Sequence, residues 1–141
     1  MQINICTITD VYDVYYLICE LEETQFDFKK FKKIFNDKLE NEKNYFILAK
    51  NDNNAIGFLN LSIDYQLHHK NKVATIEELI VSYKFRNNGI GKLLINNAIK
   101  YAKNNNCELI ELTSNFSREK AHNFYIKNGF KKISYKFKMD L

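Results

Sequence analysis

Glycine and arginine are scarce in this 141-residue chain, yet one short segment holds two of the four glycines and one of the two arginines. The segment lies between an apolar stretch and an amphipathic one and reads Arg86-Asn87-Asn88-Gly89-Ile90-Gly91-Lys92. The first turn of a helix leaves backbone N–H groups unpaired and carries partial positive charge. Glycines let a phosphate approach those groups closely, and flanking cationic side chains add formal charge. The pattern therefore predicts an anion site, with an ordinary strand-to-helix turn as the alternative.

Two common phosphate-binding motifs do not describe this segment. A Walker A loop requires GxxxxGK[ST], whereas the chain has GIGKL. A dinucleotide fingerprint requires GxGxxG, and Leu94 stands where its third glycine would be. A bound phosphate would therefore be held by a different kind of loop.

Two adjacent carboxylates, Glu77 and Glu78, interrupt the apolar stretch VATIEELIV at residues 73–81. Burying a carboxylate in apolar surroundings is costly unless a cavity or a polar partner receives it. Alternation along a strand is expected to send the two side chains to opposite faces of a sheet. Either one of them serves chemistry in a cleft, or both are structural, in ion pairs or at a sheet edge.

A second group of motif residues follows further along the chain, as Arg118-x-x-Ala121-His122-x-Phe124-Tyr125-x-x-x-Gly129-Phe130. Together with Arg86-x-x-Gly89-x-Gly91 it resembles the two signatures of the GNAT N-acetyltransferase superfamily, an acyl-coenzyme A loop and an A-x-x-F-Y-x-x-x-G-F helix. The resemblance covers residues 73–130 closely, and the N-terminal third matches only in the order of its elements. The family's loop often begins with Gln where this chain has Arg86, and Arg is also common there.

The resemblance implies acetyl-coenzyme A as co-substrate, with no metal. In this family the strand before the loop splays from the next strand, and the pantetheine arm pairs with backbone groups in the gap. The diphosphate would rest on N–H groups of the loop. Two residues after the next strand would add further contacts. The implied cofactor-binding residues are Leu79, Ile80, Val81, Arg86, Asn87, Asn88, Gly89, Ile90, Gly91, Lys92, Asn115 and Arg118.

Acetyl transfer from a thioester to an amine needs a base for the ammonium, hydrogen-bond donors for the oxyanion and a proton for the leaving thiolate. The resemblance implies Glu77 as the base, directly or through a water, with Glu78 in reserve. It implies Tyr125 as the acid, since a phenol with a pKa of about 10 is protonated at neutral pH. The oxyanion donor would be a backbone N–H near Leu79. The alternative for Tyr125 is an ordinary core residue.

The other candidate groups carry weaker patterns. His68 and His69 are expected to be exposed in a polar loop, and His122 to pack or hydrogen-bond locally. No cluster of His, Cys and Asp has the spacing of metal ligands. The three cysteines are few and widely spaced, which fits free thiols in a reducing cytoplasm.

Periodicity predicts the elements that must position these residues. Strands are expected over 2–8, 45–50, 55–63, 73–81, 107–113 and 130–138. Helices are expected over 11–23, capped by Asp10, and over 27–40, 90–104 and 118–127, the last ending at Gly129. The order β-α-α-β-β-β-α-β-α-β predicts an α+β fold with a mixed sheet flanked by helices, in one domain over 1–141.

Composition excludes several classes of protein. Hydrophobic residues are 45% and charged residues 27%, as in an ordinary globular chain. No apolar run approaches the roughly 20 residues of a membrane-spanning helix, and the N-terminal stretch lacks the features of a secretory signal, so no membrane partner is expected. A net charge of +4 is mild, so no nucleic-acid partner is expected.

The sequence thus predicts an acetyl-CoA-dependent N-acetyltransferase that transfers an acetyl group to a primary amine by direct attack in a ternary complex. One alternative is a non-catalytic acyl-CoA sensor or regulatory protein. Another is a nucleic-acid-binding module using the lysine- and aromatic-rich C-terminus, which also fits an amphipathic last strand. The acceptor stays open among an antibiotic, an amino acid, a polyamine and a protein amino group. Many relatives form dimers, so a homodimer stays open as well.

Overall fold

Two long strands joined by a tight turn form the centre of the sheet, β2 (Asn44–Asn51) and β3 (Asn54–Tyr65). The turn places Asp52 and Asn53 at φ values of 49° and 69°. Asp and Asn tolerate this left-handed backbone, which a two-residue hairpin turn needs to match the twist of its strands. The hairpin expected from the sequence is therefore confirmed.

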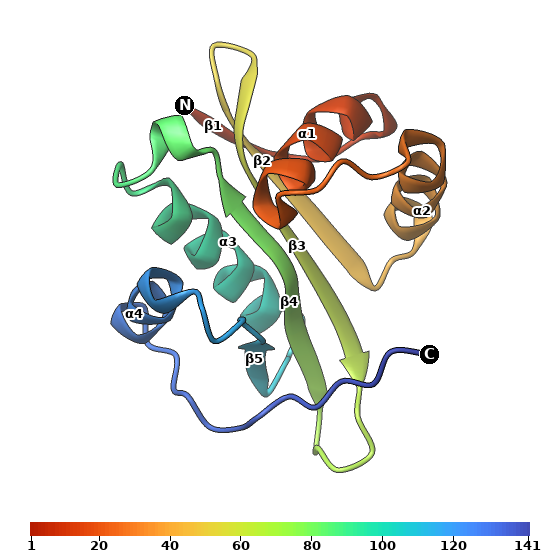
Figure 1. Cartoon of the computed structure of the whole chain (residues 1–141). Helices are drawn as coiled ribbons and strands as arrows, with labels where there is room; N and C mark the ends of the chain where they lie inside the picture. Colours follow the sequence, from red (N-terminus) through yellow and green to blue (C-terminus); the bar gives the residue numbers. More distant parts are fainter.

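The computed structural model describes residues 1–141 and extends this hairpin into a five-stranded sheet in the order β1-β2-β3-β4-β5 (Figure 1). The added strands are β1 (Gln2–Ile5), β4 (Lys72–Val81) and β5 (Leu109–Leu112). The first four strands are antiparallel to their neighbours, whereas β5 runs parallel to β4. A mixed sheet of this kind was predicted, although β1 and β5 are shorter than expected.

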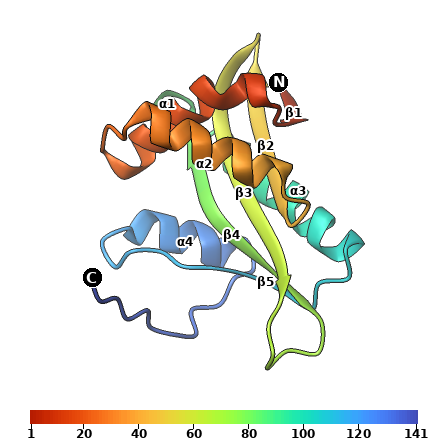
Figure 2. The same cartoon turned by 90° about the vertical axis from the view of Figure 1, so that its right-hand side faces the viewer.

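Helices cover both faces of the sheet (Figure 2). Helices α1 (Val11–Glu22) and α2 (Phe28–Glu40) lie on one face. Helix α3 (Ile90–Asn104) lies on the other face and begins and ends where the sequence predicts. Helix α4 (Glu119–Lys127) packs on the same side as α3. None of these helices is both long and apolar enough to span a membrane.

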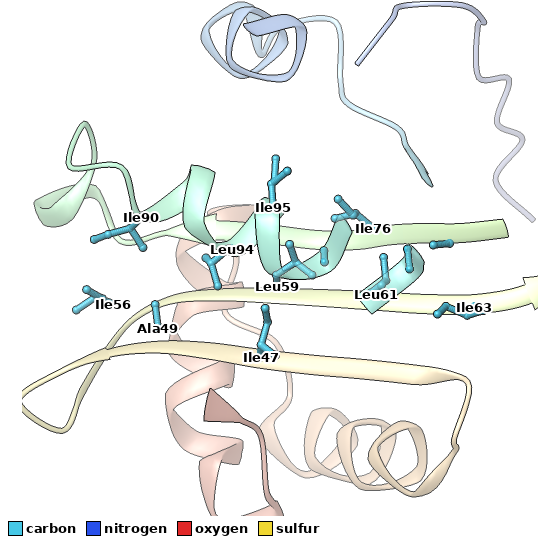
Figure 3. Packing of buried hydrophobic residues seen from close by; sticks show 13 residues of the cluster. Ile47, Ala49, Ile56, Leu59, Leu61, Ile63, Ile76, Ile90, Leu94 and Ile95 are labelled. Carbon is cyan, nitrogen blue, oxygen red and sulfur yellow. The ribbon is translucent and has the colours of Figure 1, made fainter. Parts of the chain in front are cut away.

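Alternation along the central strands divides the core between the two faces. On β2, Ile47 and Ala49 join the cluster under α3, which Figure 3 shows with Leu94 and Ile95 of that helix. Phe46 and Leu48 point the other way and pack beneath α1 and α2. Since both faces are covered, the central strands read as continuous apolar runs. The core under α3 includes Ile76, the last residue of β4 that pairs with β5.

The end of α4 follows the sequence expectation closely. Gly129 has a φ of 95°, and its N–H donates to the carbonyl of Ile126 at 3.1 Å. The N–H of Phe130 donates to the carbonyl of Tyr125 at 3.0 Å. This pair of bonds is a Schellman motif, which favours glycine because only glycine adopts a positive φ without strain. The cap fixes the turn that carries Tyr125.

Two local expectations are wrong. Asp10 does not cap α1 with its side chain, because its carboxylate accepts from the Thr7 N–H and from Lys50, both at 2.8 Å. The strand predicted over 130–138 is also absent, and this segment belongs to no sheet. Its alternating pattern suits a strand, but a strand also needs a neighbour for its N–H and C=O groups, and in this chain none lies alongside.

Candidate active site

Strand β4 leaves its parallel neighbour halfway along its length. The β4–β5 pairing runs from Val73 opposite Leu109 to Ile76 opposite Leu112 and then stops. Beyond it, β4 continues to Val81 and pairs only with β3 on its other side. The backbone edge from Glu77 onward is therefore open toward β5. Leu79, Ile80 and Val81, predicted to contact pantetheine, lie in this stretch, and the carbonyl of Val81 accepts from Arg86 Nε at 3.0 Å.

The loop after β4 leads into α3 without a side-chain cap. Gly89 is the N-cap residue with a φ of 77°, and Asn87 also has a positive φ, of 65°. The first helical bond of α3 runs from the N–H of Leu93 to the carbonyl of Gly89. The N–H groups of the preceding turn, from Ile90 to Lys92, consequently have no carbonyl behind them within the helix. Such a helix start suits an anion.

The charged residues of this loop are exposed. Arg86 bonds back to β4, and its guanidinium lies 3.8 Å from the Glu20 carboxylate on α1. Asn88 stabilises the loop, because its side-chain amide donates to the carbonyls of Phe85 and Arg86. Lys92 stands exposed in the first turn of α3. The predicted loop residues are thus gathered at one helix start, where both cations are exposed and Arg86 also contacts Val81 and Glu20.

Gly91 brings the two sequence motifs into contact. A Cβ atom at this position would lie 3.1 Å from Phe124 Cζ on α4. That separation is tighter than ordinary van der Waals contact, so α4 packs closely against α3 only because residue 91 lacks a side chain. The glycine of the first motif therefore helps to position the helix of the second.

A cavity of about 340 Å³ opens where β4 and β5 part. Its wall combines the end of α1, the middle of β4, the residues after β5 and one side of α4. It also includes a lysine of the C-terminal segment. The lining residues are Leu21, Glu22, Ile76, Glu77, Glu78, Leu79, Leu112, Thr113, Ser114, Asn115, Ser117, Arg118, Tyr125 and Lys136.

Both predicted carboxylates line this one cavity, which corrects the expectation that they lie on opposite faces. The β3–β4 register slips between Asn60 and Leu61, so that Asn60 faces Glu78 and Leu61 faces Ile76. Glu77 is the extra residue of a β-bulge, and a bulge breaks the alternation of side chains. The bulge therefore allows two neighbouring carboxylates to reach the same space.

The two carboxylates differ in environment. Glu78 is half-buried and accepts a hydrogen bond from the side-chain amide of Asn60. Burial raises the pKa of Glu78 above its ordinary value, and the bond from Asn60 opposes that rise. Glu77 is exposed and accepts from Ser62 Oγ at 2.9 Å. Partial burial therefore favours the protonated form of Glu78.

Asn60 is a residue that the sequence analysis missed. It is buried on β3, and the oxygen of its side-chain amide has no hydrogen-bond partner. Its signal was available, since a polar residue stands inside the apolar run GFLNLSI just as the two acids stand inside theirs. Lys136 was also missed as a lining residue, because nothing in the pattern of the last segment places it beside β4.

Tyr125 lies half-buried in the cavity wall. Its ring meets those of Phe124 and Phe130 edge-on, with centroids 5.6 Å and 5.9 Å away. Burial raises the pKa of the Tyr125 hydroxyl, and the positive charge of Arg118 opposes the rise. The phenol is therefore held in its protonated form at neutral pH and can donate a proton into the cavity.

Arg118 and Asn115 line the cavity but also carry structural bonds. The Arg118 guanidinium donates to the carbonyl of Leu21 at 2.8 Å, which ties the start of α4 to the end of α1. The Asn115 side chain accepts from the N–H and hydroxyl of Ser117. His122 shares a hydrogen bond with the backbone carbonyl of Asn115 at 2.8 Å. Their structural bonds shape the wall opposite β4.

The two remaining histidines, His68 and His69, lie apart from this cavity. His69 pairs with Glu108, and neither it nor His68 lines the cavity. No group of three or more His, Cys, Asp or Glu side chains is arranged to hold a metal ion. All three cysteines are free thiols.

Comparisons with known proteins agree with this geometry. The model of the Acetyltransferase (GNAT) family matches residues 7–130. The aminoalkylphosphonate N-acetyltransferase of Salmonella typhimurium is 32% identical over 136 residues, which are 96% of this chain and 88% of that protein. A crystal structure of a transcriptional regulator from Bacillus halodurans C-125 superposes with a TM-score of 0.91 at 26% identity, covering 99% of both chains. Aminoglycoside N-acetyltransferase AAC(6')-Iy in complex with CoA superposes with a TM-score of 0.88 at 20% identity, covering 99% of this chain and 93% of that one.

Proposed function

Since this chain belongs to the GNAT family of acetyltransferases, we propose that it transfers the acetyl group of acetyl-CoA to a small primary amine held in the cavity between β4 and β5. One observation carries the proposal. The open edge of β4 runs from a cavity lined by two carboxylates and a phenol toward the uncapped start of α3. A thioester laid along β4 would there meet an amine acceptor beside groups that accept and donate protons.

The residues present fit coenzyme A. Its diphosphate would rest on the N–H groups of Ile90, Gly91 and Lys92, with Arg86 supplying charge beside them. Asn87, Asn88 and Gly89 would shape the loop around it. The pantetheine arm would lie along the open edge at Leu79 and Ile80, close to Asn115 and Arg118 across the gap. The co-substrate supplies the activated acetyl group, and the protein supplies its position and the handling of protons.

A carboxylate in the cavity would take the proton of the ammonium. The resemblance to the family implies Glu77, whereas partial burial, which raises the pKa of Glu78, favours Glu78. We assign proton acceptance to Glu78 and keep Glu77 as the alternative, acting through a water. Asn60 would orient the Glu78 carboxylate through its hydrogen bond.

Tyr125 would return a proton to the leaving sulfur. Its hydroxyl lies in the same cavity and is kept protonated by burial. A backbone N–H near Leu79, on the open edge of β4, would serve as the donor to the carbonyl oxygen under attack. The proposed base and acid would thus line one cavity, the base on β4 and the acid on α4.

The cavity favours an amine that also carries an anionic group. Carboxylates of Glu22, Glu77 and Glu78 can attract the ammonium, while Arg118 and Lys136 offer positive charge in the same cavity. Aminoalkylphosphonates have this chemistry, and they are the acceptors named for the Salmonella relative. They are therefore the first acceptors to be tested with this chain.

The test measures thiol release from acetyl-CoA with a panel of amines and an amine-free control. We expect release only in the presence of an amine, fastest with an aminoalkylphosphonate and slower with a polyamine, an aminoglycoside or an amino acid. Binding of CoA by calorimetry without turnover on any amine would favour the sensor function instead. Absence of CoA binding would contradict both functions.

A further inference from the structure

Glu20 lies at a helix position that disfavours an acid. It belongs to the last turn of α1, which carries no basic residue. The C-terminal end of a helix is the negative end of its dipole, so a carboxylate there is unfavourable to the helix. The Glu20 side chain is nevertheless half-buried, with 29% of its surface exposed. The reason for a glutamate at this position therefore lies outside α1.

The Glu20 carboxylate reaches the segment that joins β4 to α3. Its two oxygens accept from the Ser82 hydroxyl and from the Tyr83 N–H, each at 3.2 Å. Ser82 precedes the single 3₁₀ turn Tyr83–Phe85 and does not cap it with its own side chain. The first N–H of such a turn has no carbonyl behind it within the turn. Glu20 thus satisfies two donors in a segment that lies about sixty residues further along the chain.

The same carboxylate also faces Arg86, which follows this turn. Arg86 Nη2 lies 3.8 Å from Glu20 Oε2, while Arg86 Nε donates to the Val81 carbonyl at 3.0 Å. The guanidinium is thus held by β4 on one side and by α1 on the other. Arg86 is the residue proposed to supply charge beside the diphosphate, so these contacts set the direction of that charge.

We propose that Glu20 is a positioning residue, which fixes residues 82–89 between β4 and α3 so that they receive a diphosphate. This role rests on the proposed function, in which the start of α3 binds the diphosphate of acetyl-CoA. Glu20 itself would not contact the co-substrate, because a carboxylate repels a diphosphate. It acts through Ser82, Tyr83 and Arg86. A loop that is already held in place loses less conformational freedom when the anion binds.

The end of α1 holds both arginines of the chain, but in different ways. Arg86 faces the side chain of Glu20, whereas Arg118 donates to the backbone carbonyl of Leu21 at 2.8 Å. A substitution of the Glu20 side chain leaves this backbone carbonyl in place. The loop can therefore be disturbed without breaking the bond that ties α4 to α1.

Glu20→Ala is a test in which charge and positioning predict opposite results. Loss of a negative charge near the anion site would by itself strengthen CoA binding, and Ala also suits the end of the helix better than Glu does. If the carboxylate positions the loop, the Kd for CoA should instead rise by about 10-fold, the equivalent of one or two hydrogen bonds. Calorimetry on the full chain measures the change.

Two further variants separate the hydrogen bonds from the charge. Glu20→Gln keeps one oxygen as an acceptor and should restore part of the affinity for CoA. Glu23→Ala is the matched control, because it removes an exposed carboxylate from the end of the same helix. It should leave the Kd for CoA unchanged.

Steady-state kinetics distinguish positioning of the loop from support of the whole fold. For Glu20→Ala, the KM for acetyl-CoA should rise while kcat at saturation stays nearly unchanged, as expected when only binding is weakened. The groups proposed to move protons, Glu78 and Tyr125, make no hydrogen bond with Glu20. A parallel fall in kcat would overturn the positioning role.

Amide hydrogen exchange on the ligand-free chain tests the contact without any co-substrate. The Tyr83 N–H should exchange faster in Glu20→Ala than in the native chain and at the native rate in Glu23→Ala. Unchanged exchange at Tyr83 in Glu20→Ala, or an unchanged or lower Kd for CoA, would overturn the proposal. A native chain that binds no CoA would instead contradict the proposed function, and the exchange rate would still decide whether Glu20 holds the loop.

Discussion

Partial burial of Glu78 has opposite effects on catalysis and on the stability of the folded chain. Its partial burial makes it a better base and also makes its charged form costly to hold in the folded chain. A carboxyl group whose pKa is raised by folding favours the native state when protonated. That contribution is lost as pH rises through the raised pKa. Activity and stability are therefore expected to depend on this side chain in opposite ways.

Glu78→Gln is expected to lower kcat/KM by about 10²-fold or more, the usual contribution of a general base. The acid limb of the pH–rate profile, which reflects protonation of Glu78 above its ordinary pKa, should disappear. The variant should also be at least as stable as the native chain at neutral pH, with the difference growing as pH rises. Kinetics across pH and urea unfolding at several pH values provide the measurements.

Glu77→Gln is the matched control for this substitution, because it removes the neighbouring carboxylate from the same cavity. It should retain the acid limb and lose little activity. If instead Glu77→Gln abolishes the acid limb and Glu78→Gln preserves it, Glu77 is the base and partial burial does not decide which carboxylate accepts the proton.

Tyr125→Phe is expected to reduce kcat by about 10²-fold while leaving the Kd for CoA nearly unchanged, because it removes only the hydroxyl that donates the proton. The ring packing against Phe124 and Phe130 survives the change. Steady-state kinetics with calorimetric binding separate the two effects. Unchanged turnover would return Tyr125 to the role of a core residue.

The chemistry of single residues could be predicted from the sequence more fully than their geometry could. Glu77, Glu78 and Tyr125 were found because acids in an apolar strand and a motif tyrosine stand out in a single chain. That both acids reach one cavity depends on a bulge against β3, which is a property of two strands aligned together. Asn60 reaches the site through the same pairing, whereas its own strand shows only a polar residue inside an apolar run.

At the level of elements, α3 and α4 pack closely where Gly91, which has no side chain, faces Phe124. Gly91→Ala would bring its Cβ to 3.1 Å from Phe124 Cζ, so the Phe124 ring on α4, next to Tyr125, would have to move by a few tenths of an ångström. We expect a fall in kcat together with a loss of stability of about 1–3 kcal/mol, as for other overpacked positions. Kinetics and denaturant unfolding measure the two effects.

Phe124→Leu, added to Gly91→Ala, should restore part of both losses because it makes room at the contact. The control is Gly89→Ala, whose new side chain meets no atom within 4 Å but whose backbone has a φ of 77°. Gly89→Ala should lower the free energy of unfolding through backbone strain alone, and Phe124→Leu should not change the size of that loss. If Phe124→Leu restored stability equally to the Gly91→Ala and Gly89→Ala variants, the packing of α4 would not depend on residue 91.

Elements with strong local determinants were predicted well, and those that depend on a partner were not. Helix α3 was correct at both ends because its amphipathic stripe and its opening glycine are encoded within the element. The segment at 130–138 has an equally clear period, yet it forms no strand and pairs with no strand of the sheet. Local pattern specifies the conformation that a segment prefers, and only tertiary or quaternary contact provides its hydrogen-bond partners.

At the scale of the whole molecule, the proposed co-substrate would bridge parts of the chain that pack on one sheet. The open edge of β4 and the start of α3 belong to the same core, while Arg118 links α4 to α1. A ligand that binds only the native state adds about 2.7 kcal/mol at a concentration of a hundred times its Kd. For a chain of this size, that corresponds to a rise in Tm of about 10 °C.

Pantetheine and CoA together separate the contribution of the phosphates from that of the β4 edge. We expect CoA to raise Tm strongly and pantetheine, which lacks the diphosphate, to raise it much less at the same concentration. The advantage of CoA should shrink as salt is added, because Arg86 and Lys92 are exposed and their attraction is screened over about 10 Å at 0.1 M salt. Thermal unfolding followed by circular dichroism measures the shift in Tm with CoA, with pantetheine and with CoA at added salt. Equal shifts for the two ligands would mean that the start of α3 does not bind phosphate, since the helix dipole and both cations act only on the charged part of the molecule.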